Sequence, residues 1–215
     1  MAEEYVGVKF SVSLRGTAPA IASDSRAAEL CEWSLRFHDL GMRPDYRKRN
    51  GGTASAGNLS YRLREGENAF VITPTGAPAV GLTPNELVLV DKVDEARRVV
   101  YARGGARGAS SGAASVTLGP SSESIMHHAV YAARRDVNAV FHGHSNEILR
   151  GAQRLGFAQT RKFEEYGTLE LAREAVACLG RRNFLVLKEH GFLSVGAALR
   201  EAGEQAMRLR EKAIK

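Results

Sequence analysis

The chain has 215 residues, of which 44% are hydrophobic and 25% are charged, proportions typical of one globular domain with a sizeable core. The 30 Lys and Arg residues outnumber the 24 Asp and Glu residues, which gives a formal net charge of +6. The basic residues occur in scattered pairs with no alternating aromatic residues, so we expect a surface that attracts a phosphorylated metabolite and no nucleic-acid partner.

Location follows from two further features of the composition. The two cysteines, Cys31 and Cys178, lie far apart in helix-like segments, which suits a reducing cytoplasm. No apolar run approaches the length of a membrane span, and the acidic start does not resemble a signal peptide. We therefore predict a cytoplasmic protein without a membrane partner.

The first residues show no clear helical period. Residues 6–14 alternate loosely between apolar and polar and are typical of an edge strand. A helix is predicted to begin after the capping run Ser23-Asp24-Ser25 and to end before Gly41, with one broad apolar face. Trp33 lies on that face, so it belongs either to the core or to a subunit interface.

Strands dominate the part of the chain that follows. The small residues of 51–57 predict that no packed element forms there, whereas residues 59–63 and 69–73 alternate and predict a hairpin. Further strands are predicted over residues 87–91 and 98–102. The composition then changes to Gly, Ala and Ser.

Residues 103–115 are low in complexity and are predicted to form a flexible loop. No Gly-Lys-Ser/Thr follows these glycines, which excludes a P-loop. Beyond them, helices and strands alternate. The helices are predicted over residues 120–134, 145–155, 168–179 and 197–215, and the strands over 138–144, 184–188 and 192–195.

A strand-rich first half and an alternating second half predict an α/β fold. We expect a mixed, mostly antiparallel central sheet covered by helices on both faces. Residues 23–215 are interpreted as this domain, and residues 1–22 as an N-terminal extension.

Three histidines are candidates for a metal site. His142 and His144 are two residues apart in a strand, so both side chains point to the same side. His190 ends another apolar strand and would join them if residues 184–189 lay near residues 138–143. Three neutral imidazoles with an open fourth position form a catalytic zinc site. The alternatives are a buried histidine pair held by backbone carbonyls, or three unrelated histidines.

Glu123 lies at the start of a predicted helix. It is either a first-turn glutamate favoured by the helix dipole, or a carboxylate beside the metal that acts as general base or labile ligand. His127, one helical turn further along, either supports Glu123 or belongs to the core or surface.

A phosphate could bind at the same helix start. Ser121 and Ser122 offer hydroxyl groups beside free backbone N–H groups, although ordinary helix capping also explains them. Asn58 and the Thr75-Gly76 turn, at two other strand–loop junctions, could add donors to the same anion. Each of these three is also a common turn residue.

Together, five stretches between residues 25 and 212 resemble the class II aldolase/adducin family in order and spacing. They are Gly57-Asn58-Leu59-Ser60-Tyr61-Arg62, Ile72-Thr73-Pro74-Thr75-Gly76, Pro120-Ser121-Ser122-Glu123, His142-Gly143-His144 and His190-Gly191. The resemblance implies the three-layer sandwich of that family. It also implies a homotetramer with active sites at subunit boundaries.

The resemblance further implies a chemistry and its residues. The expected reaction is cleavage of a small phosphorylated ketose to dihydroxyacetone phosphate and an aldehyde through a metal-stabilised enediolate. Glu123 would be the acid/base. Zn²⁺, or another divalent ion such as Mn²⁺ or Co²⁺, would bind His142, His144 and His190, and the substrate phosphate would bind Asn58, Thr75, Gly76, Ser121 and Ser122.

One position departs from the fuculose-type aldolases. These have a proton-donating tyrosine three residues before an aromatic-Gly-Thr, whereas this chain has Phe163 before Tyr166-Gly167-Thr168. The phenol is missing unless Tyr166 replaces it. The aldehyde half of the reaction and its stereochemistry therefore stay open. The alternatives to an aldolase are an epimerase, a decarboxylase or a dehydratase on a sugar phosphate or sugar acid, and an adducin-like interaction module without catalysis.

Overall fold

The computed structural model describes residues 7–48, 51–108 and 116–215 of the chain. The helices are α1 (Ser25–Asp39), α2 (Ser124–Ala133), α3 (Asn146–Gly151), α4 (Leu169–Leu179) and α5 (Leu199–Ile214), with the 3₁₀ helices η1 (Pro19–Ser23) and η2 (Pro84–Glu86). The strands are β1 (Ser11–Thr17), β2 (Asp45–Arg47), β3 (Thr53–Ser55), β4 (Asn58–Arg62), β5 (Phe70–Ile72), β6 (Val88–Asp94), β7 (Val99–Arg107), β8 (Val116–Leu118), β9 (Ala139–Gly143), β10 (Phe184–Leu187) and β11 (Gly191–Gly196).

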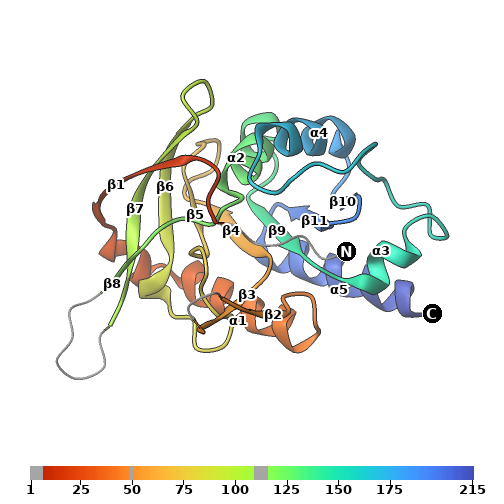
Figure 1. Ribbon diagram of the computed structural model, residues 1–215, viewed down its shortest axis with the longest axis horizontal. Helices are drawn as coiled ribbons and strands as arrows, with labels where there is room; N and C mark the ends of the chain where they lie inside the picture. Colours follow the sequence, from red (N-terminus) through yellow and green to blue (C-terminus); the bar gives the residue numbers. More distant parts are fainter. Residues whose placement is uncertain (1–6, 49–50, 109–115) are drawn as a thin grey trace.

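One large sheet runs through the molecule in the order β1-β7-β6-β5-β4-β9-β11-β10, with β8 paired to β7 (Figure 1). Strand β1 pairs with β7 in parallel, and the other pairs of the described chain are antiparallel. The mixed, mostly antiparallel sheet is therefore confirmed. The predicted edge strand exists but is displaced along the chain to Ser11–Thr17.

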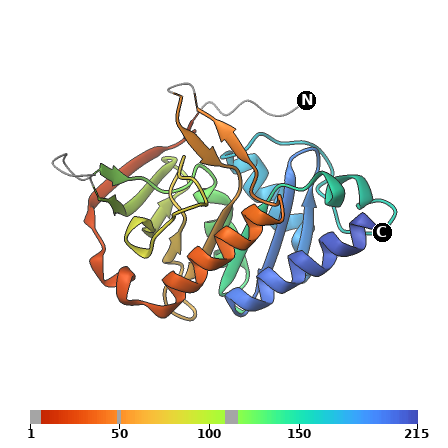
Figure 2. The ribbon, with the colours of Figure 1, turned by 90° about the horizontal axis from the view of Figure 1, so that it is seen from below.

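Helices cover both faces of this sheet, as predicted. Helices α2 and α4 pack on one face, whereas α1, α3 and α5 pack on the other (Figures 1 and 2). Because side chains alternate along a strand, Val140 belongs to the first core and Phe141 to the second. In the described part of the chain, no helix combines the length and the apolar character needed to cross a membrane.

The predicted helix start and hairpin are confirmed. The Asp24 side chain accepts a hydrogen bond from the Arg26 backbone N–H at the start of α1. Trp33 is 4% exposed and belongs to the core of this chain. Strands β4 and β5 form the antiparallel hairpin, with Arg62 opposite Phe70.

Two predictions of loops are wrong. Residues 53–55 form β3, which pairs with β2, and the Ser55 hydroxyl donates to the Asp45 carboxylate at 2.6 Å. The strand forms without large apolar side chains because the hydrogen bond from Ser55 to Asp45 holds β3 against β2. Residues 103–107 continue β7, where the bare α-carbon of Gly105 passes against η2, since a Cβ would lie 2.0 Å from the Glu86 carbonyl oxygen. Residues 109–115 of the predicted loop lie outside the described residues.

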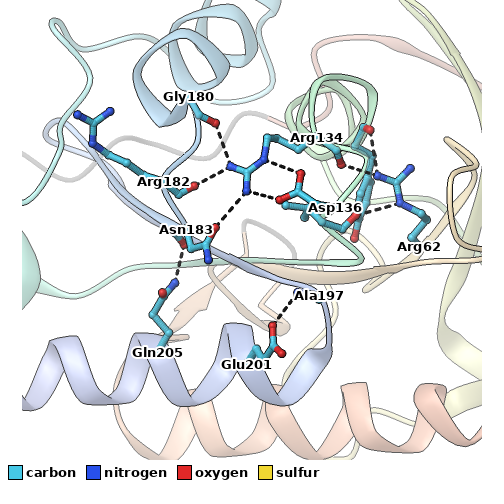
Figure 3. Close-up of polar contacts among 11 residues, drawn as sticks. Arg62, Arg134, Asp136, Gly180, Arg182, Asn183, Ala197, Glu201 and Gln205 are labelled. Carbon is cyan, nitrogen blue, oxygen red and sulfur yellow. Dashed lines mark hydrogen bonds and ion pairs between the residues drawn. The ribbon is translucent and has the colours of Figure 1, made fainter.

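Arginines fasten the helices at one end of the central strands (Figure 3). Arg62, at the end of β4, donates to the carbonyl oxygens of Tyr131 and Arg134 at the end of α2. Arg134 in turn donates to the carbonyl oxygens of Gly180 and Arg182 beyond α4. The opposite end of β4 and β9 carries the polar residues described next.

Candidate metal centre

Three imidazoles meet at the end of strand β9. His142 lies in β9 and His144 follows it, with ring centroids 4.8 Å apart. His190 lies in the turn between β10 and β11, and β11 pairs directly with β9, which brings its ring within 4.9 and 5.1 Å of the other two. The three predicted ligands therefore come together, although β11 separates β10 from β9.

Close approach of the two strands requires a glycine after His190. A Cβ on Gly191 would lie 2.4 Å from the Gly143 carbonyl oxygen and 3.0 Å from Cε1 of His142. Any side chain at position 191 would thus push β11 and His142 apart. The His-Gly pair noted in the sequence has this steric reason.

The orientation of His142 is fixed by the backbone. Its Nδ1 lies 2.9 Å from the Phe192 carbonyl oxygen, which can only accept, so Nδ1 carries a proton. In the neutral ring Nε2 then carries a lone pair, and it lies 3.1 Å from Nε2 of His144. One ligand atom from each of the three histidines lies within 4.8 Å of the others. Such a set of imidazole nitrogens, one of them held by a backbone carbonyl, fits a divalent ion such as Zn²⁺.

Glu123 adds a buried carboxylate to this cluster. It is 4% exposed, immediately precedes α2, and places Oε2 3.0 Å from His142 Nε2 and Oε1 3.6 Å from His190 Nε2. Burial raises the pKa of Glu123, but the nearby imidazoles of His142 and His190 outweigh burial and hold the pKa below its usual value. Glu123 is therefore a carboxylate at neutral pH.

The imidazoles differ in their protonation. Burial lowers the pKa of His142, but the Glu123 carboxylate outweighs it and leaves that pKa raised. Burial lowers the pKa of His144 well below its usual value, and that of His190 to about 4. His144 and His190 are thus neutral at pH 7, with nitrogen lone pairs available to a cation.

Asn58 lies beside Glu123. Its Nδ2 donates to Glu123 Oε2 at 2.8 Å, and its Oδ1 lies 2.6 Å from His127 Nε2. His127 is hydrogen-bonded in turn to Ser60, and Ser60 to Tyr131. Ser60 and Tyr131 were not among the site residues predicted from the sequence, although Glu123, His127 and Tyr131 recur at the four-residue spacing of one helix face.

The other predicted phosphate-site residues form one neighbourhood. The Thr75 backbone N–H donates to the Gly119 carbonyl oxygen at 3.1 Å, which brings the Thr75-Gly76 turn against the segment leading to Ser121 and Ser122. Ser121 and Ser122 are 4% and 8% exposed. The Ser121 hydroxyl oxygen accepts from the Glu123 backbone N–H at 3.3 Å, so the serines and the carboxylate share one helix start.

The aromatic pair near residue 165 is divided between surface and interior. Phe163 is 39% exposed, whereas Tyr166 is 6% exposed and lies under the Lys9 ammonium group, 4.0 Å from its ring centre. The Lys9 ammonium group also forms an ion pair with Glu165 at 2.8 Å. Position 163 is accessible to a neighbouring molecule, and it carries no hydroxyl group.

Comparison with known proteins identifies relatives along most of the chain. It is 31% identical to the 5-methylthioribulose-1-phosphate/5-deoxyribulose-1-phosphate aldolase of Rhodospirillum rubrum over 189 residues, 76% of this chain and 71% of that protein. It is 28% identical to the L-fuculose phosphate aldolase of Escherichia coli K12 over 194 residues, 82% of this chain and 75% of that protein.

Solved structures share the fold. An L-fuculose 1-phosphate aldolase superposes with a TM-score of 0.64 at 21% identity, covering 89% of this chain and 86% of that one. The L-fuculose-1-phosphate aldolase of Thermus thermophilus gives 0.62 at 22% identity, covering 89% and 92%. The family model for the class II aldolase and adducin N-terminal domain matches residues 44–213. The chain therefore belongs to the class II aldolase/adducin family.

Proposed function

We propose that the protein is a metal-dependent lyase that cleaves a small phosphorylated ketose to dihydroxyacetone phosphate and an aldehyde. The observation that carries this proposal is the buried Glu123 carboxylate set against the cluster of His142, His144 and His190. Two relatives whose names describe aldolases of ketose phosphates support the reaction class.

The histidines would hold the metal ion, and Zn²⁺ suits three imidazole nitrogens best, with Mn²⁺ or Co²⁺ as further candidates. A bound divalent ion would act as a Lewis acid and stabilise the negative charge that develops on the substrate. His142 is oriented for this role by its hydrogen bond to the Phe192 carbonyl oxygen.

The chain's own residues would fix the substrate and move the proton. Asn58, Ser121, Ser122 and the Thr75-Gly76 turn would bind the phosphate, which sets the register of the carbon chain. Glu123 would transfer a proton to or from the carbon next to the carbonyl group, and its Oε1 is buried without a hydrogen-bond partner among the described residues.

We also propose the finer features of the family for this chain. These are a homotetramer with sites at subunit boundaries, a reducing cytoplasmic location, and a domain of residues 23–215 preceded by an extension. The exposed Phe163 supports a site completed by a neighbouring subunit, and the two cysteines, both free, support a reducing compartment.

Glu123→Gln tests the proposal because it keeps the size of the side chain but removes the base. The wild type should exchange a dihydroxyacetone phosphate proton with solvent and cleave at least one member of a panel of ketose phosphates. In the variant both rates should fall by about 10²–10⁴-fold, with metal content and circular dichroism unchanged. Proton exchange needs no aldehyde, so it does not depend on the missing tyrosine.

Other results would point elsewhere. If the metal-loaded wild type catalyses neither exchange nor cleavage, the lyase proposal fails, and an epimerase, a decarboxylase, a dehydratase or an adducin-like binding module takes its place. If exchange survives fully in Glu123→Gln, another group moves the proton.

A further inference from the structure

A row of polar side chains joins strand β4 to helix α2 beneath Glu123. We call Asn58, Ser60, His127 and Tyr131 the polar ladder. Along α2, Glu123, His127 and Tyr131 follow at four-residue intervals, a rise of about 6 Å each. Along β4, Asn58 and Ser60 are two residues apart, about 6.6 Å. These similar steps keep helix and strand in register, so the polar side chains of α2 meet those of β4.

The contacts of the polar ladder are short and buried. Ser60 Oγ lies 2.7 Å from the Tyr131 hydroxyl oxygen and 2.6 Å from His127 Nδ1. His127 Nε2 lies 2.6 Å from Asn58 Oδ1. Ser60, His127 and Tyr131 are fully buried, and Asn58 is 4% exposed, so water cannot replace a missing partner.

Every donor in the polar ladder is determined by the carboxylate at its end. Glu123 can only accept, so Asn58 presents Nδ2 to it and turns Oδ1 towards His127. His127 Nε2 must then donate, and burial, which lowers the His127 pKa to about 3, leaves Nδ1 as an acceptor. Ser60 donates to Nδ1, and the Tyr131 hydroxyl donates to Ser60. All four hydrogen bonds therefore point the same way, towards Glu123.

This polarity distinguishes the two oxygens of the carboxylate. Oε2 is held by Asn58 and lies 3.0 Å from His142 Nε2, whereas Oε1 is buried without a hydrogen-bond partner in the described chain. If His127 took the other tautomer, the Asn58 amide would turn and set its carbonyl oxygen against Oε2. Repulsion would then displace the carboxylate.

We propose that His127 is a positioning residue that, through Asn58, fixes the Glu123 carboxylate and presents Oε1 to the reacting carbon. This inference rests on the proposed function, in which Glu123 transfers the proton. It adds a residue that touches neither metal nor substrate. It also gives Asn58 a second role beside the proposed contact with phosphate.

Two replacements of His127 separate positioning from packing. In His127→Gln the amide nitrogen reaches the position of Nε2 and can still donate to Asn58, whereas the shorter amide of His127→Asn reaches only the position of Nδ1. Both remove the buried ring. His128→Asn is the matched control, because His128 lies on the same helix, 3.9 Å from Glu95 and outside the polar ladder.

We expect kcat of His127→Asn to fall on the order of 10–100-fold with metal content unchanged, and KM to change less than kcat because Asn58 is one of several proposed phosphate contacts. His127→Gln should recover most of this loss, and His128→Asn should match the wild type. Equal kcat values for His127→Asn and His127→Gln would overturn the inference. An inert wild type would instead overturn the proposed function, and this consequence with it.

The tautomer of His127 gives a readout that needs no turnover. Imidazole nitrogen NMR of the full chain, assigned by the signals lost in His127→Asn, should show a neutral ring protonated at Nε2. Tyr131→Phe should keep this tautomer, because Ser60 still donates to Nδ1. Ser60→Ala should also keep it, because Asn58 Oδ1 still accepts from His127 Nε2. A wild-type ring protonated at Nδ1 would contradict the polar ladder.

Discussion

Single residues at the candidate metal centre determine how closely its strands approach each other. The bare α-carbon of Gly191 lets β11 approach β9, since a Cβ there would lie 2.4 Å from the Gly143 carbonyl oxygen. That approach in turn holds His142, whose Nδ1 donates to the Phe192 carbonyl oxygen. The ligand geometry is therefore as sensitive to position 191 as to the histidines themselves.

We expect Gly191→Ala to lower both stability and metal affinity. The added methyl group has no space, and overpacking of this kind costs about 1–3 kcal/mol in the free energy of unfolding. Urea unfolding and metal content after dialysis would measure the two effects. Gly119→Ala is the control, because a Cβ there meets nothing within 4 Å. A Gly191→Ala protein with full metal content and unchanged stability would show that β9 and β11 can separate freely.

At the scale of single residues, the sequence predicts which side chains could bind a metal better than it predicts which side chains are hydrogen-bonded to each other. Imidazoles two residues apart and a histidine before a glycine predicted a cluster that the fold does assemble, because residue type and strand period determine what can meet. The polar ladder could not be predicted in the same way. Glu123, His127 and Tyr131 define a helix face, but only the packing of α2 on β4 shows that Ser60 lies under it.

Helices α2 and α4 are held at their C-terminal ends by side chains from other elements (Figure 3). Arg62 is 1% exposed and donates to the last carbonyl oxygens of α2, which have no partner within the helix. Arg134 donates to the carbonyl oxygens of Gly180 and Arg182, beyond α4, at 2.9 and 2.8 Å. It also donates to both carboxylate oxygens of Asp136, which fixes its position. Because α2 is fixed at its C-terminal end, the position of Glu123 at its N-terminal end is constrained as well.

Asp136→Asn should destabilise the protein in a pH-dependent way. The hydrogen bonds from Arg134 lower the pKa of Asp136 to about 2, from an ordinary value of 3.8. A lowered pKa in the folded state means that the stabilisation is complete above pH 3.8 and is lost as the pH falls towards 2. Because the Asp136 side chain is 67% exposed, the ion pair contributes about 1 kcal/mol or less to the free energy of unfolding.

Urea unfolding at pH 7, 5 and 3 would measure this difference in the free energy of unfolding. It should be constant between pH 7 and 5 and shrink at pH 3. Arg134→Lys should lose stability at all three values, including pH 3, since it also removes hydrogen bonds to carbonyl oxygens that do not titrate. A constant effect of Asp136→Asn down to pH 3 would exclude the ion pair as its cause.

The elements that the sequence missed are those without an apolar period. Long helices and the hairpin β4–β5 were predicted because apolar residues recur along them. Strand β3 and the end of β7 were read as loops because Gly, Ala and Ser carry no such signal. Both are held by contacts that only the tertiary structure provides, for example the hydrogen bond from Ser55 to Asp45.

At the scale of the molecule, the described residues form two cores on opposite faces of the large sheet. The candidate metal centre lies where several segments meet. Its candidate ligands come from the end of β9 and from the turn between β10 and β11, while Glu123 comes from the start of α2. A bound ion would therefore join segments that are 48 residues apart, from His142 to His190. Such a link stabilises the native chain only when the ion is present.

Removal of the metal should leave the fold intact but lower the melting temperature. The two cores involve dozens of buried apolar side chains on both faces of the sheet, so folding does not require the ion. An ion at 100 times its dissociation constant adds about 2.7 kcal/mol to the stability of the native state. For a chain of this length that corresponds to a melting temperature about 5–11 °C higher.

Calorimetry of chelated and zinc-loaded protein would measure the shift, with circular dichroism to verify that the chelated chain stays folded. His190→Ala is the control, because it removes one of the three imidazoles that face the proposed ion. The shift should disappear in that variant, while its chelated form should melt near the chelated wild type. If zinc raises the melting temperature of His190→Ala as much as that of the wild type, the ion binds elsewhere. Unfolding of the wild type on chelation would show instead that the ion is part of the core.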